Sequence, residues 1–205
     1  MKLIFRITIC VILLVFIPFL LSAQNKGTFI DSRDNHTYKW VKISDQTWMA
    51  ENLNYKTKTG SWYYNNDSVN SNGVLYNYET IGNGMIEDSI KFKGICPDGW
   101  HLPTISEWDK LFIFVGKGLA GDKLKSVKFK GGGDNFSFSV LPNGRCYLTN
   151  KTMIFENKST HAYFWSCTER DQTTVWGLFI YSEMSNISKI DVEKNYGLSV
   201  RCIKN

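Results

Sequence analysis

Several common functional signatures are missing from this 205-residue sequence. It has no Cys-x-x-Cys pair and no cysteine–histidine cluster with metal-ligand spacing, so no structural zinc site is expected. Its 24 basic residues are scattered singly among 19 acidic ones, without a basic block, and nucleic acid is therefore not an expected partner. Helical and strand-like segments do not alternate as βαβ units, which excludes a doubly wound parallel sheet. We expect no cofactor and no metal.

The amino terminus predicts a secretory signal peptide over residues 1–23. Lys2 and Arg6 precede an uncharged run over residues 7–21, which ends in Leu-Ser-Ala. This run spans only about 22 Å as a helix, against roughly 30 Å for a bilayer core, so the signal peptide is favoured over a membrane anchor. We therefore expect a secreted or cell-surface protein with no stable transmembrane segment after cleavage, and a single domain over residues 24–205.

The strongest local signal lies between Ile95 and Leu111. Its first half, Cys-Pro-Asp-Gly, suits a tight turn. Thr104 and Glu107 then have the spacing of a capping box, in which each residue satisfies a backbone N–H of the other. Apolar residues follow at i, i+3, i+4 and i+7, namely Trp108, Leu111, Phe112 and Val115. This pattern predicts a helix that ends near Gly116.

Strand-like patterns dominate the remainder of the chain. A second short helix is expected over residues 75–81. The predicted strands cover residues 27–30, 37–43, 46–50, 136–140, 145–149, 161–168, 174–182, 187–192 and 198–203. The chain therefore has the pattern of an α+β fold, with two short helices packed on a mainly antiparallel sheet. Trp40 and Trp48 are expected to face each other across the hairpin that carries them.

Several other aromatic and polar residues are expected to have structural roles. We expect Trp100, Trp108, Trp165 and Trp176 in the core. The three histidines are far apart in the sequence and are expected at turns or on the surface. Asn52 and Glu169 are expected to tie loops to the scaffold, because buried polar side chains require hydrogen-bond partners.

Four cysteines remain after the signal peptide, namely Cys96, Cys146, Cys167 and Cys202. An even number in an exported chain favours disulfides. Four cysteines allow three pairings, which the spacing alone does not distinguish.

One aromatic stretch suggests a binding surface. Trp62, Tyr63 and Tyr64 are followed directly by Asn65 and Asn66. Aromatic rings stack on the apolar faces of sugars, while amides bond their hydroxyl groups, so this stretch is the candidate ligand-binding site. The alternative is an edge strand followed by a turn, with no ligand.

Four blocks of the chain stand out together. They are DSRDNHTYKWVKISDQTWMAENLNY (31–55), ICPDGWHLPTISEW (95–108), FWSCTE (164–169) and KNYGLSVRCIK (194–204). These blocks resemble the Fibrobacter succinogenes major paralogous domain family. The blocks occur in the family's order and span nearly the whole mature chain. The family is found in exported bacterial proteins, and no function is established for it. Its pattern in turn resembles C-type lectin-like domains and the formylglycine-generating proteins.

The resemblance implies a C-type lectin-like fold with a disulfide between Cys96 and Cys202. The sequence departs from the family pattern at Cys146 and Cys167, which stand at positions that are usually not cysteine. Two unusual cysteines that occur together predict a second bridge, Cys146–Cys167.

A binding module is the function that this pattern favours. The expected partner is a polysaccharide or another surface protein, and the alternative is a structural or adhesive surface protein. The calcium signatures of lectins are absent, so sugar binding would be calcium-independent. Less favoured are a formylglycine-generating-type oxidase, which works through a pair of reactive cysteines, and a hydrolase that uses two of the carboxylates Glu51, Asp67, Glu107 and Glu169. We expect no enzyme and assign no catalytic residue.

Overall fold

The computed structural model describes residues 25–82 and 91–205; the predicted signal peptide lies outside these ranges. The strands are β1 (Lys26–Ile30), β2 (Thr37–Ile43), β3 (Gln46–Met49), β4 (Ser61–Trp62), β5 (Leu75–Tyr76), β6 (Trp100–His101), β7 (Arg145–Thr149), β8 (Thr152–Glu156), β9 (His161–Glu169), β10 (Thr174–Tyr181), β11 (Ser188–Glu193), β12 (Leu198–Ser199) and β13 (Ile203–Lys204). The helices are α1 (Tyr78–Ile81), α2 (Ile105–Val115) and α3 (Ala120–Leu124), with 3-10 turns η1 (Tyr64–Asn66) and η2 (Lys117–Leu119). The predicted α+β class is confirmed. No helix in the described ranges is long and apolar enough to cross a membrane.

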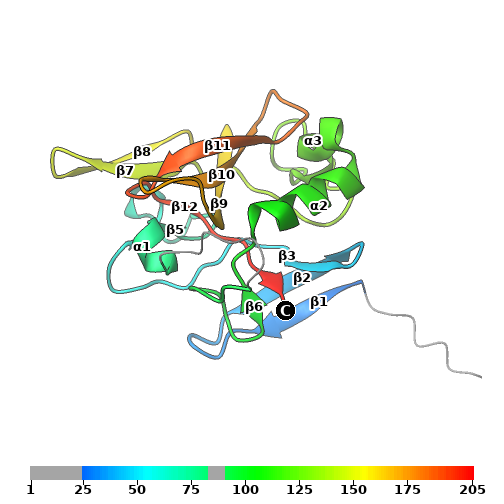
Figure 1. Ribbon diagram of the computed structural model, residues 1–205, viewed down its shortest axis with the longest axis horizontal. Helices are drawn as coiled ribbons and strands as arrows, with labels where there is room; N and C mark the ends of the chain where they lie inside the picture. The colour runs from blue at the N-terminus through cyan, green and yellow to red at the C-terminus, as the bar shows by residue number, and fades with distance from the viewer. Residues whose placement is uncertain (1–24, 83–90) are drawn as a thin grey trace, which may run out of the picture.

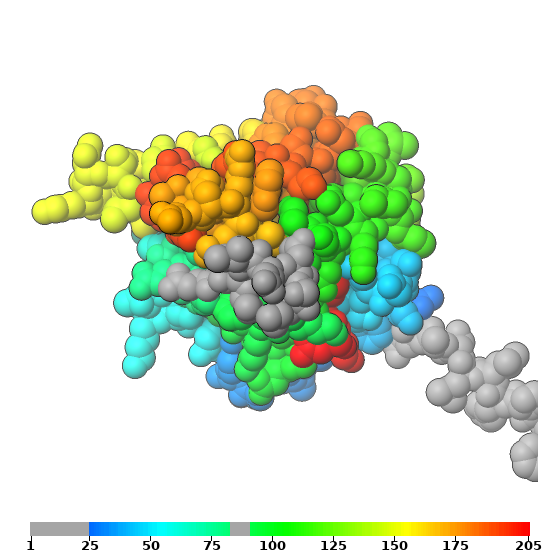
Figure 2. Space-filling view, in the orientation of Figure 1, coloured from blue at the N-terminus to red at the C-terminus, as the bar shows by residue number. Residues whose placement is uncertain are grey.

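Two sheets form the body of the protein (Figure 1). One has the order β1-β2-β3-β13-β6, and the other has the order β11-β10-β9-β12-β5-β4. Helices α2 and α3 lie together at one side of the two sheets, and α1 lies at the opposite side. Strands β7 and β8 form a separate hairpin that projects from the body (Figure 2).

The carboxy-terminal segment belongs to both sheets. β12 pairs with β5 and β9, whereas β13 pairs with β3 and β6. Between these two strands, Cys202 forms a disulfide with Cys96, 106 residues earlier, with the Cα atoms 6.0 Å apart. The bridge that the family resemblance implies is therefore present, and it fixes the turn before α2 to the strand that joins the sheets.

Helix α2 forms where the capping box predicts it. The Thr104 hydroxyl accepts the Glu107 N–H at 3.1 Å, and the Glu107 carboxylate accepts the Thr104 N–H at 2.9 Å. The four residues of the predicted stripe are all buried. The Trp108 ring packs 4.5 Å from that of Trp48, so the helix is anchored to β3 by aromatic contact.

Two strand predictions and one helix prediction differ from the structure. Residues 136–140 alternate like a strand but form a turn-rich loop, because Ser137 and Ser139 both have a φ of +55°. The run over residues 198–203 is divided into β12 and β13, since the chain leaves one sheet and enters the other. The predicted helix over residues 75–81 is shorter: Leu75–Tyr76 is strand β5, and Asn77 caps the helix that follows.

The predicted contact between the two hairpin tryptophans is wrong. Trp40 pairs with Met49 and Val41 pairs with Trp48, so the two indoles point to opposite faces of the sheet. Trp48 lies in the core that contains α2, whereas Trp40 packs against the other core cluster.

The predicted Cys146–Cys167 bridge is also wrong. Both residues are buried thiols, and they lie in two different hydrophobic clusters. Cys146 lies on β7, in a small cluster with Tyr64 of η1 and Leu75 of β5. Cys167 lies on β9 in the main core, so two residues that both depart from the family pattern are separated by the fold.

Most of the expected structural residues have the roles assigned to them. Trp100, Trp108 and Trp165 are buried, whereas Trp176 is half-buried beneath the Arg170 guanidinium. Asn52 donates to the Asn72 carbonyl at 2.8 Å and Glu169 pairs with Lys194 at 3.0 Å, so both tie loops to the scaffold. His101 is buried instead of exposed, and its ring nitrogens contact Glu107 and Asn205 at 2.9 and 2.7 Å.

Reduction of the Cys96–Cys202 disulfide should lower the free energy of unfolding by up to about 5 kcal/mol, because the bridge closes a loop of about 100 residues in the unfolded chain. The change is measured as the shift of the guanidinium midpoint with and without dithiothreitol. The matched control is Cys96→Ala/Cys202→Ala, whose midpoint should not respond to the reductant. Alkylation of the denatured, unreduced protein should modify Cys146 and Cys167 alone among these four cysteines. Modification of Cys96 or Cys202 would contradict the assignment.

Candidate functional site

The predicted ligand-binding stretch, residues 62–66, lies beside the β7–β8 hairpin. Trp62 and Tyr63 are half-buried, and the Tyr64 ring is buried 5.4 Å from Phe155 of β8. Asn65 and Asn66 are exposed in η1 and have φ angles of 52° and 59°. The three rings therefore pack against the scaffold, and only the two amides are fully presented to solvent.

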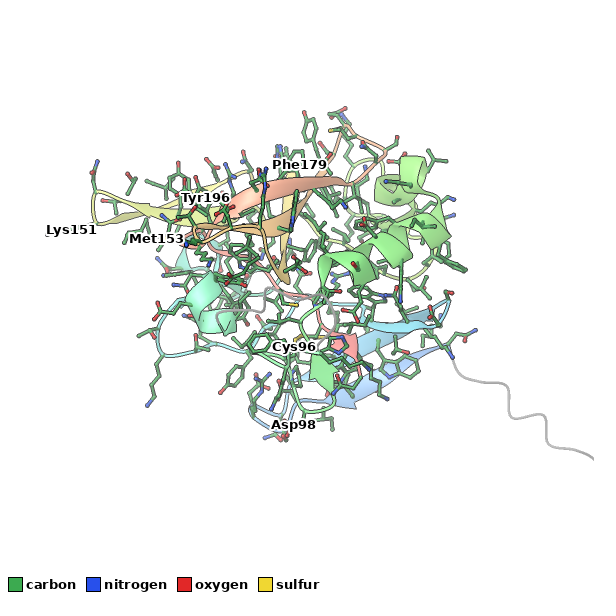
Figure 3. The ribbon with its side chains drawn as sticks, viewed as in Figure 1. Cys96, Asp98, Lys151, Met153, Phe179 and Tyr196 are labelled. Carbon is green, nitrogen blue, oxygen red and sulfur yellow. A yellow bond between two sulfur atoms is a disulfide. The ribbon has the colours of Figure 1, made fainter. Side chains whose placement is uncertain are left out.

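A different set of aromatic residues forms a continuous surface strip. We call it the aromatic row, and it consists of Tyr147, Tyr196, Tyr163, Phe179, His161 and Tyr181. Five of the six side chains are half-exposed, and Tyr163 is 4% exposed. In Figure 3, Tyr196 lies between Phe179 and the hairpin tip at Lys151.

The row arises from the pairing of β9 with β10. Tyr163 is opposite Phe179 and His161 is opposite Tyr181, so four rings lie on the same face of the sheet. The opposite face, with Phe164, is buried against the core that contains α2. Alternation along the two paired strands therefore places the four rings on one face, where His161, Phe179 and Tyr181 are half-exposed and Tyr163 is buried.

Ring contacts connect the four members of the row on β9 and β10. Phe179 lies 5.4 Å from Tyr163 and 5.2 Å from His161, and His161 stacks on Tyr181 at 4.6 Å. Such centroid separations are those of favourable aromatic pairs, so the rings hold one another in place. The surface is preorganised, because each ring is already packed on its neighbour.

Arg145 extends the row across to the next segment. Its guanidinium lies 5.0 Å from the ring of Tyr163 and 5.0 Å from the ring of Tyr196. Tyr196 in turn lies 5.0 Å from Tyr147. Glu156 accepts a bond from Arg145 Nε at 2.6 Å, which fixes the guanidinium between the two rings.

A glycine allows the hairpin to reach the row. Cys146 and Gly197 exchange two backbone hydrogen bonds, of 3.0 and 2.7 Å. A Cβ atom at position 197 would lie 2.4 Å from the Cys146 sulfur, so only glycine permits this approach. Tyr196 is thereby held beside β7.

The polar groups at the row are neutral or paired. The Asn157 amide donates to the Tyr163 hydroxyl at 3.2 Å. Burial, and then the nearby Arg145 charge, lower the pKa of His161 below its ordinary value. His161 is therefore neutral at pH 7, and its ring adds an uncharged face to the strip.

The sequence contains a signal for this surface. β9 and β10 both carry aromatic residues at alternate positions, and their pairing brings these residues together. The prediction of residues 62–66 rests on contiguous aromatic residues. Trp62 ends β4 and Tyr64 begins η1, so these rings do not share one strand face.

The groups considered for catalysis are already engaged elsewhere. Glu107 belongs to the α2 cap, Glu51 accepts the Lys39 N–H at 2.9 Å, and Asp67 bonds the Asn70 amide at 2.8 Å. Burial raises the pKa of Cys146 to about 12, which opposes formation of a thiolate. No group of three or more potential metal-ligating side chains occurs within residues 25–82 and 91–205.

Comparison with known proteins identifies one family. The family model of the Fibrobacter succinogenes major domain matches residues 41–204, which is most of the chain. No curated protein and no solved structure matches the sequence significantly.

Substitution of Arg145 by Met should raise the pKa of His161 toward its ordinary value, because the substitution removes a neighbouring positive charge. Since unfolded His161 binds a proton more readily than folded His161, the wild type should lose stability as the pH falls below about 6.5. The pKa is measured by NMR titration of the imidazole proton resonances. Arg170→Met is the control, because Arg170 lies over Trp176 outside the row. An equal shift in both variants would contradict the assigned cause.

Proposed function

The chain belongs to the Fibrobacter succinogenes major domain family, and from that premise we propose that it is an exported module that binds carbohydrate on the aromatic row, without calcium and without catalysis. The observation that carries this proposal is the strip of contacting rings on β9 and β10, half-exposed except for Tyr163, which Arg145, Tyr196 and Tyr147 extend.

The chemistry of the strip suits a saccharide chain. The C–H faces of pyranose rings are apolar and pack on aromatic rings, while their hydroxyl groups require hydrogen-bond partners at the edge. Arg145 supplies donors in a fixed fork, and Glu156 supplies acceptor oxygens. Asn157 and Thr160 add an amide and a hydroxyl beside Tyr163 and His161.

Preorganisation favours binding at this surface. A tyrosine or phenylalanine side chain has only two rotatable bonds to fix, and the rings of the row already contact one another. Little conformational entropy therefore remains to be lost when a ligand binds.

Location and fold are part of the same proposal. We place the mature protein outside the cell, because residues 1–23 have the pattern of a signal peptide and the Cys96–Cys202 disulfide suits an oxidising compartment. We further propose that the scaffold is C-type lectin-like. A disulfide that ties the last strand to the turn before the main helix, with loops presented around it, supports that comparison.

A protein ligand is the second candidate, and the β7–β8 hairpin favours it. The hairpin projects from the body, and β8 has one unpaired edge among the described strands. Leu148 on β7 is 54% exposed. An extended peptide from another surface protein could add to such an edge.

The carbohydrate proposal is tested with Phe179→Ala and Tyr196→Ala in pull-down and affinity measurements on a panel of cellulose, xylan, chitin and mannan. Each substitution should weaken binding by about tenfold, or ~1.4 kcal/mol, because each removes one stacking face. Binding should persist in EDTA, because the row offers rings, a guanidinium and an amide instead of a carboxylate cluster.

Two control variants sharpen this test. Phe114→Ala removes a phenylalanine that is 54% exposed on α2, outside the row, and should leave binding unchanged. Asn65→Gly/Asn66→Gly keeps the left-handed backbone of η1 but removes both amides. If this double variant loses polysaccharide binding, the ligand binds at residues 62–66 instead of the aromatic row. Binding to no polysaccharide by the folded wild type would refute the proposal and favour a protein ligand.

A further inference from the structure

A concave site of different character lies away from the aromatic row. It is a cleft of about 810 Å³. Strands β1 and β2 contribute one part of its lining, and the loop over residues 126–141 contributes another, together with residues from 50–54 and 71–73. No residue of the aromatic row lines it. The volume is that of an ordinary small-molecule site.

The cleft carries an excess of positive charge. Its charged lining residues are Lys26, Lys39, Lys128 and Arg201 against Glu51 and Asp134. Glu51 is already engaged, since it accepts the Lys39 N–H at 2.9 Å and lies 3.4 Å from the Lys39 ammonium. Asp134 accepts the N–H and the hydroxyl of Ser139 at 2.8 and 2.5 Å. Lys26 and Lys128 form no ion pair within the described ranges, so both exposed ammonium groups remain available at the cleft.

Arg201 provides a second and independent observation. Its side chain is 1% exposed, and the guanidinium lies 4.5 Å from the centre of the Phe138 ring. It donates to the Asn52 amide oxygen at 2.6 Å and to the Phe138 carbonyl, while its Nε has no hydrogen-bond partner in the described structure. No described carboxylate forms an ion pair with it. Glu51 and Asp134 of the same cleft act on it only from beyond ion-pair distance. A buried guanidinium that borders a cleft and has no directly paired carboxylate favours an anion in that cleft.

The wall of the cleft is held in a fixed shape. Asp134, Ser137 and Ser139 have φ angles of 44°, 55° and 55°, which residues other than glycine rarely adopt. The Asp134 carboxylate and the Arg201 guanidinium both bond to this loop and stabilise it. A strained backbone conformation persists only where the surrounding contacts hold it in place, and such conformations are common at ligand sites.

Neutral hydrogen-bonding groups accompany the cations. Asn54, Ser71, Asn72 and Ser137 line the cleft, and all four are at least partly exposed. We propose that the cleft binds an acidic saccharide: Lys26, Lys128 and Arg201 attract its carboxylate, and the amides and hydroxyls bond its hydroxyl groups. The inference goes beyond the aromatic row, because it assigns a second site and a charged ligand class.

The test uses trigalacturonate and its methyl ester, which has the same sugar framework without the negative charge. Isothermal titration calorimetry on the full chain should detect trigalacturonate binding that weakens with added salt, and the ester should bind at least about tenfold more weakly. Lys26→Glu/Lys128→Glu should lose binding by more than about tenfold, whereas Lys110→Glu, on the exposed side of α2, should lose far less. Both lysines of the double variant are exposed, so its fold should be intact and is checked by circular dichroism.

Several results would overturn the inference. Equal binding of the acid and its ester would exclude recognition of the carboxylate. Equal affinity for acetate and trigalacturonate would show that the sugar rings are not recognised. Unchanged trigalacturonate binding in Lys26→Glu/Lys128→Glu would show that the ligand does not bind in the cleft. Phe179→Ala separates this inference from the function proposed above: trigalacturonate binding should survive that substitution, and its loss would place the acidic ligand on the aromatic row.

Discussion

The fold depends on one short segment, residues 198–204, that belongs to both sheets at once. Leu198 and Ser199 pair within one sheet, and Ile203 pairs within the other. The disulfide at Cys202 fixes the crossing point to the turn before α2. Because backbone pairing and a covalent bond act on the same few residues, the relative position of the two sheets is fixed there.

The same segment also organises the loops. Arg201, between the two strands, bonds to Asn52 and to the Phe138 carbonyl, so it connects loops that are distant in the sequence. Ser199 accepts the Asn143 amide at 3.2 Å. Loops held in this way can differ in sequence while the scaffold persists, which is the usual arrangement of a binding module. The aromatic row, in contrast, is carried mainly by paired strands and is rigid for that reason.

Local chemistry made parts of this structure predictable. The Thr104–Glu107 capping box and the apolar stripe after it predicted α2 correctly, because both act within two helical turns. The pattern of residues 136–140 misled the prediction, since alternation of apolar and polar residues does not report the left-handed φ angles at Ser137 and Ser139. For the candidate site, the prediction named the contiguous stretch over residues 62–66, whereas the larger strip of contacting rings lies on β9 and β10. The aromatic row needs the register that places Tyr163 opposite Phe179, and register is a property of two strands together.

The sequence by itself determined the α+β class, the family, the main helix and, through the family resemblance, the Cys96–Cys202 bridge. These features are encoded in short motifs whose interactions are local, or in blocks that the family shares. Only the tertiary structure decided that Cys146 and Cys167 lie in separate clusters, and that Arg201 borders a basic cleft. The reason is physical: these outcomes depend on which distant segments pack together, and the pattern of one segment shows which of its faces is buried but does not identify the segment that covers it.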